Sequence, residues 1–280
     1  MKLLLSAFLA LFSTANGMGF GQNWKGLHVK WDISPFSDGF MDMVKKMQSK
    51  EMLEDFCQGA NQPFRGKAYV VQHDKYIAVL FDVNGNIAGI QSYVPADQGW
   101  TPAGGYGRKY FLQHSTPDGK PYWVQTVYFM DPTTICTTGR SNSAYVGNGL
   151  WMQMGSDPEK DVFHVPDKES DIQSTPWAQT GKCFYTMGQH YWYNVHKAMK
   201  CDDMVPYCLL YNAGKLNAFC FAVNHAFQDD YFDQPHPDTK VLPSFMSDVP
   251  ACMKASDPNW STFSTIHVYV NTYPRASSFC

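Results

Sequence analysis

The sequence lacks an excess of charge of either sign. Its 280 residues include 22 Lys and Arg against 25 Asp and Glu, which gives a formal net charge of -3. Affinity for nucleic acid comes largely from basic side chains that displace counterions from the phosphate backbone. We therefore expect no nucleic-acid partner. Only 17% of the residues are charged and 44% are apolar, which is enough to bury one large core or two modest ones.

Motifs of the common catalytic sites are also missing. The chain has no Gly-x-Ser-x-Gly nucleophile elbow and no Walker-type phosphate loop. It has no His-Glu-x-x-His, no His-x-His and no Cys-x-x-Cys, which are spacings that often bind zinc. The motifs alone thus do not decide whether the protein is an enzyme.

Long apolar runs are absent except at the start of the chain. Met1 and Lys2 precede a largely apolar segment from residue 3 to 12, and small or polar residues follow up to Gly17. This pattern is typical of a secretory signal peptide, because the apolar run is shorter than the ~20 residues that span a bilayer. We expect residues 1–17 to be the signal peptide, cleaved after Gly17 or after Ala15. The mature chain is then predicted to be secreted and extracellular, without a transmembrane anchor.

Export determines what the cysteines are expected to do. Their number is even, none lies in the signal peptide, and an oxidising compartment converts paired thiols to disulfides. We predict four disulfides of undetermined pairing, in preference to a catalytic thiol or a zinc cluster. The cysteines are Cys57, Cys136, Cys183, Cys201, Cys208, Cys220, Cys252 and Cys280. The sequon at Asn259 predicts a surface loop and a glycoprotein.

One amphipathic helix is predicted near the N-terminus, over residues 37–57. Apolar side chains from Phe40 to Phe56 recur near helical spacing, and charged residues fill the opposite side. Ser37 or Asp38 would cap its first turn, and Gly59 would end it. We expect this helix to pack on a sheet, because its polar side mixes both charges and lacks the basic face of a membrane-surface helix.

The remaining sequence predicts strands and turns. Asn84-Gly85 and Gly214 each lie between two apolar segments, as in tight β-hairpins. The expected fold class is α+β, mainly antiparallel β with the one N-terminal helix, and disulfide-bonded. Segments 80–90 and 209–219 match in polarity, and each is followed by another apolar stretch. This favours two related halves, residues 18–155 and 156–280, although unrelated hairpins also look alike.

Aromatic residues are abundant, with 16 Tyr, 8 Trp and 19 Phe. Most are expected to fill the core, but the polar tips of Tyr and Trp need partners when they are buried. Some are therefore predicted to line a half-open pocket for a small-molecule or saccharide ligand. The residues predicted for this pocket are Tyr191, Trp192, Tyr193, Tyr207 and Trp123.

Two of the nine histidines, His190 and His267, lie in apolar or aromatic segments. An imidazole in such surroundings loses its hydration unless it finds a partner, so this pair is a candidate site for copper or zinc. Hydrogen bonds to the backbone, or exposure on loops, are the simpler account of these histidines. An acidic cluster between Asp229 and Asp238 would suit calcium, although solvated carboxylates explain it as well.

Together these patterns favour a secreted, disulfide-stabilised protein that binds a small or saccharide ligand in an aromatic-lined pocket. One alternative is a secreted copper- or zinc-dependent enzyme that uses His190 and His267. The other is an extracellular matrix or structural component without a pocket. The sequence identifies neither the ligand nor any catalytic residue.

Overall fold

The computed structural model describes residues 23–31, 39–71, 74–97, 108–178, 181–184, 187–224, 227, 229–234, 242–253 and 264–275. Several predictions fall outside these residues: the signal peptide 1–17, the helix caps Ser37 and Asp38, the acidic Asp238, the sequon at Asn259, and Cys280. No helix in the described part of the chain is long and apolar enough to cross a membrane.

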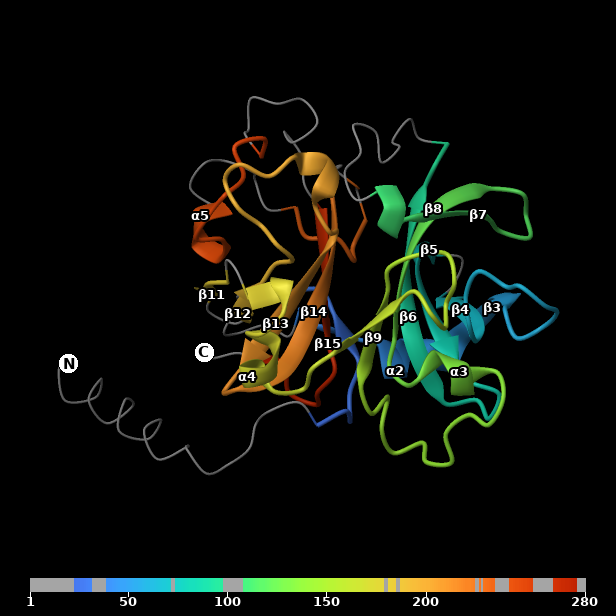
Figure 1. The fold of residues 1–280 in the computed structure, drawn as a ribbon. Coiled ribbons are helices and arrows are strands. Elements are labelled where there is room, and N and C mark those ends of the chain that lie inside the picture. Colours follow the sequence, from blue (N-terminus) through green and yellow to red (C-terminus); the bar gives the residue numbers. More distant parts are fainter. Residues whose placement is uncertain are drawn as a thin grey trace.

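Two antiparallel sheets form the molecule and lie side by side in Figure 1. The first sheet has the order β10-β9-β8-β6-β5-β4-β3, with β7 paired to β8. Its strands are β3 (Lys50–Asp55), β4 (Lys67–Val71), β5 (Asp74–Phe81), β6 (Ile87–Pro95), β7 (Leu112–Ser115), β8 (Pro121–Tyr128), β9 (Leu150–Gln153) and β10 (Val162–Val165).

The second sheet has the order β11-β12-β13-β14-β15-β1-β2. Its strands are β1 (His28–Val29), β2 (Met41–Asp42), β11 (Cys183–Phe184), β12 (Gly188–Tyr191), β13 (Tyr207–Asn212), β14 (Lys215–Val223) and β15 (Ser264–Tyr269). The prediction of a mainly antiparallel β fold is therefore confirmed.

The two sheets pack together and bury a shared hydrophobic core. Val79 of β5 in the first sheet and Phe219 of β14 in the second sheet both belong to this core. Phe129, just after β8, contacts Phe219 with ring centroids 6.2 Å apart. The other face of the first sheet packs on a smaller core that includes Phe56 and Tyr128. The second sheet also has an outer face, and the candidate site lies there.

The predicted helix over residues 37–57 is wrong. Its described residues form β2, one helical turn α2 (Met43–Lys46), a 3-10 turn η1 (Met47–Ser49) and then β3. Asp42 caps the helical turn by accepting a hydrogen bond from Lys45 N at 3.1 Å. Residues 50–55 include good helix formers, but they pair with β4 from Lys50 opposite Val71 to Asp55 opposite Lys67. Sheet pairing thus overrides the local helical pattern.

The other α-helices of the described chain are also single turns. They are α3 (Pro132–Ile135), α4 (Glu169–Ile172) and α5 (Leu242–Phe245). Short 3-10 turns lie at η3 (Arg108–Tyr110), η4 (Pro176–Ala178) and η5 (Cys201–Asp203).

The prediction that the protein is disulfide-bonded is confirmed. The bridges are Cys57–Cys136, Cys201–Cys252 and Cys208–Cys220, and Cys183 is disulfide-bonded too. None of the described cysteines is free.

The two sheets share a strand order. Each is a meander, formed by β3, β4, β5, β6, β8, β9 and β10 in the first sheet and by β11 to β15, β1 and β2 in the second. The hairpins that match in sequence, β5–β6 and β13–β14, are the third and fourth strands of the two series. Strands β1 and β2 complete the second sheet and β10 belongs to the first, so the sheets do not divide the chain at residue 155.

The pairing register matches as well. Leu80 pairs with Gly89 and Leu210 with Ala218, and a register shift follows in both hairpins. Residues that hold the same place in the two ladders are called equivalent below. Several equivalent places carry the same residue. These places are Gly66 and Gly188, Tyr69 and Tyr191, Leu80 and Leu210, Val127 and Val268, and Tyr128 and Tyr269.

Candidate functional site

The outer face of the second sheet carries a cavity of about 190 Å³ between the sheet and the segments that cover it. Four neighbouring strands each contribute one of its polar or sulfur-bearing side chains: His190 from β12, Cys208 from β13, Cys220 from β14 and His267 from β15. Cys220 pairs directly with both Cys208 and His267, and residues opposite each other point to the same face of a sheet. His190 pairs with Leu210, two residues from Cys208, which places it on that face too.

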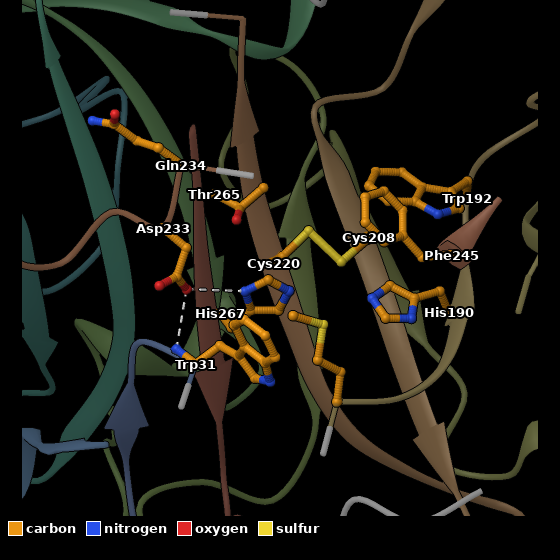
Figure 2. Close-up of a pocket in the computed structure, with 11 residues that line it drawn as sticks. Trp31, His190, Trp192, Cys208, Cys220, Asp233, Gln234, Phe245, Thr265 and His267 are labelled. Atoms are coloured by element: carbon orange, nitrogen blue, oxygen red, sulfur yellow. Dashed lines mark hydrogen bonds and ion pairs between the residues drawn. A yellow bond between two sulfur atoms is a disulfide. The ribbon is translucent and has the colours of Figure 1, made fainter. Parts of the chain in front are cut away.

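The two imidazoles are close enough to share a ligand. Their ring centroids are 6.4 Å apart, and the planes are nearly perpendicular at 84°. Candidate ligand atoms of His190, His267 and Cys208 all lie within 4.8 Å of one another. Figure 2 shows the two rings on either side of the Cys208–Cys220 disulfide, each with one nitrogen turned toward the other ring.

Each imidazole has an oxygen near one ring nitrogen, although only His190 makes a hydrogen bond there. Nδ1 of His190 lies 3.3 Å from the carbonyl oxygen of Lys182, which accepts a hydrogen bond when Nδ1 carries the proton. Nδ1 of His267 lies 3.5 Å from Oδ2 of Asp233. Asp233 Oδ2 in turn accepts a hydrogen bond from Trp31 N at 3.1 Å. Histidines that bind metals are usually oriented this way, with the non-ligating nitrogen on a carbonyl or carboxylate.

Both histidines are buried, with exposed fractions of 2% for His190 and 4% for His267. Burial, and after it the neighbouring His267, lowers the pKa of His190 to about 3. The His190 ring is therefore neutral near pH 7. A neutral imidazole offers a lone pair, which a metal ion needs and a protonated ring cannot supply.

The remaining walls are mainly apolar. The His190 ring stacks on Phe245 with centroids 5.6 Å apart, and it lies nearly parallel to Trp192 at 6.4 Å. Trp31 and Met187 also line the cavity. Met187 brings a thioether, a soft and polarisable group, next to the two imidazoles.

Of the predicted aromatic residues, only Trp192 lines this cavity. The hydroxyl of Tyr191 donates to Glu169 Oε1 at 2.7 Å, and Tyr193 packs on Trp177 with centroids 5.5 Å apart. Tyr207 is fully buried and donates to Gln153 O at 3.3 Å. Trp123 lies on β8 of the first sheet.

Sequence reasoning missed several of the residues around the histidine pair. Trp31 comes from a distant segment, and Met187, three residues before His190, belongs to no ligand motif, so neither was assigned to the cavity. Asp233 was expected only as part of an acidic cluster. Asp229 of the same cluster accepts a hydrogen bond from Tyr231 N at 2.7 Å. The spacing of Cys208 and Cys220 around the Gly214 turn did contain a signal, because it places them opposite each other in a hairpin.

Comparison of the chain with protein-family models, with curated proteins and with solved structures finds no match.

Proposed function

We propose that this protein binds one copper or zinc ion between His190 and His267. The observation that carries the proposal is the pair of buried imidazoles with ligand atoms inside 4.8 Å, each ring with an oxygen near its Nδ1. Imidazole suits both metals, and metal–nitrogen bonds of about 2.0–2.1 Å join two nitrogens roughly 3–4 Å apart. A small closure of the two rings is enough to form such bonds.

The surroundings of the pair support copper(I) in particular. Soft ligands and an apolar shell favour this ion, and Met187, Trp192 and Phe245 provide both in the same cavity. In this proposal the protein is exported, because the disulfides on both sheets suit an oxidising compartment. Oxidative or hydrolytic chemistry would require a substrate to reach the ion through the aromatic walls.

Metal titration of the purified full chain tests the proposal. We expect one ion per chain, and nitrogen ligands in the X-ray absorption spectrum of the copper(I) form. His267→Ala should weaken binding by about 100-fold or more, because two ligands become one. His164→Ala changes an exposed histidine of the first sheet and should leave binding unchanged. A wild-type protein that takes up neither copper(I) nor zinc would refute the proposal.

A second candidate function is the capture of a small aromatic ligand in the same cavity. Its support is the wall of Trp31, Trp192 and Phe245. A cavity of about 150 Å³ holds a benzene ring, so the 190 Å³ observed here suits a single ring better than a saccharide of several units. Quenching of tryptophan fluorescence by phenol, reduced in Trp192→Leu, would support this function. Quenching by disaccharides alone would contradict it.

A further inference from the structure

The Cys208–Cys220 bridge differs from the other described disulfides in what it connects. Its two cysteines are 12 residues apart and face each other in the ladder of β13 and β14. The Cys57–Cys136 and Cys201–Cys252 bridges close loops of 79 and 51 residues. A disulfide stabilises a fold mainly by closing loops in the unfolded chain, so the shortest loop contributes least.

The first sheet shows that this register needs no bridge. The residues equivalent to Cys208 and Cys220 are Ala78 and Gln91, and they pair in the same way in the hairpin β5–β6. Backbone hydrogen bonds alone therefore hold two such positions opposite each other. We therefore expect this strand pairing to persist without the Cys208–Cys220 disulfide.

Both sulfurs lie at the proposed metal site. Cys208 and Cys220 line the cavity together with His190 and His267, and the Cys208 sulfur is within 4.8 Å of the candidate nitrogens. A sulfur in a disulfide is a poor ligand, whereas a thiolate binds zinc and copper(I) strongly. Two imidazoles and two thiolates form the Cys2His2 set that is typical of zinc.

We propose that reduction of the Cys208–Cys220 disulfide converts this cavity into a four-ligand His2Cys2 metal site, which makes its metal affinity dependent on redox state. The inference rests on the proposed function, since it adds two ligands to the same two histidines. In the oxidised protein the imidazoles bind alone and more weakly. In the reduced protein the thiolates complete the coordination.

The reaction balances with a small thiol as the reductant. Two thiol molecules transfer two electrons and two protons to the bridge, which breaks the S–S bond, yields two cysteine thiols, and leaves the reductant as its own disulfide. Binding of a divalent ion by both sulfurs then releases the two protons. A small-molecule disulfide reverses the step: it accepts two electrons from the two thiolates and becomes two thiols, while the Cys208–Cys220 bond re-forms and the ion leaves the sulfur ligands.

Zinc and cobalt(II) are the probes for the test. The full chain is titrated with zinc against a competing chelator before and after mild reduction, and bridge cleavage is mapped by mass spectrometry. We expect affinity to rise by about 100-fold or more on reduction, because two thiolates join two imidazoles. Cobalt(II) should show a thiolate-to-metal charge-transfer band in the reduced protein only. Cys208→Ala/Cys220→Ala should lose both effects, and Cys201→Ala/Cys252→Ala should keep them.

The outcomes separate this inference from the proposed function. If the oxidised protein binds zinc and reduction changes neither affinity nor the cobalt spectrum, the redox-dependent site is refuted and the two-histidine site stands. If neither form binds, both proposals fail. If the reduced protein or Cys208→Ala/Cys220→Ala loses its near-ultraviolet circular dichroism, the bridge is required for the fold and the inference is overturned.

Discussion

The two sheets place different side chains at the same four positions. In the second sheet these positions hold His190, Cys208, Cys220 and His267, and in the first sheet they hold Ala68, Ala78, Gln91 and Thr126. The first-sheet set is fully satisfied, since Gln91 Nε2 donates to Thr126 Oγ1 at 2.9 Å and the alanines pack in the smaller core. Strand order and register therefore do not require histidine or cysteine at these four positions.

Transferring the four first-sheet residues to the second sheet should abolish metal binding. The variant His190→Ala/Cys208→Ala/Cys220→Gln/His267→Thr should lose copper and zinc affinity by well over about 100-fold, because every proposed ligand is gone. Its far-ultraviolet circular dichroism should match wild type, because the first sheet accommodates the same set. Metal affinity that survives the exchange would place the site elsewhere in the protein.

The glycines at equivalent places in the two sheets should be equally intolerant of substitution by alanine. Gly66 and Gly188 have φ of +101° and +112°, and an added Cβ would lie 3.0 Å from Phe81 O and 2.8 Å from Tyr211 O. Gly66→Ala and Gly188→Ala should each lower the free energy of unfolding by about 1–3 kcal/mol, because the residue is strained and crowded. Urea denaturation measures this. A large loss in only one variant would show that the two sheets differ in this turn.

The equivalent tyrosines should differ in what their hydroxyl groups contribute to stability. Tyr128 OH donates to Gln153 Oε1 at 2.7 Å and accepts from Arg65 N at 3.2 Å. In the described part of the chain, the buried Tyr269 OH has no hydrogen-bond partner. Tyr128→Phe should therefore cost about 1–2 kcal/mol of stability, and Tyr269→Phe should be neutral or slightly stabilising. Equal losses in urea denaturation would contradict this prediction.

Asp74, the first residue of β5, should affect stability only at mildly acidic pH. Burial raises the pKa of Asp74 to about 6, and the hydroxyl of Tyr231 lies against it. The folded state then binds more protons than the unfolded state between about pH 4 and 6, so stability falls as pH rises through this range. Asp74→Asn should flatten that part of the stability profile, and the exposed Asp171→Asn should not. An unchanged profile in Asp74→Asn would assign the pH dependence to other groups.

The sequence predicted the hairpins and the disulfides because their signals are local. Asn84-Gly85 and Gly214 mark tight turns, and the even cysteine count indicates pairing. The helix over 37–57 failed because residues 50–55 carry a helical pattern but gain more from pairing with β4. Propensity is a weak guide wherever a neighbouring strand is available.

The candidate site was partly predictable, because its two histidines also carry a local signal. His190 and His267 were found together because an imidazole in an apolar strand needs a partner. Trp31 and Asp233 were not assigned to it, because their approach to His267 depends on how distant segments cross the sheet. The predicted aromatic set reached the cavity only through Trp192, since alternate residues of a strand face opposite ways.

The position of β1 determines when the second sheet can be finished during synthesis. His28 pairs with Tyr269, and Trp24 N donates to Val270 O at 2.9 Å, so the earliest strand waits for the last one to leave the ribosome. The first sheet has no such delay, because all its strands lie between residues 50 and 165. A newly made chain should thus contain a folded first sheet while the histidine-bearing strands still await their neighbours.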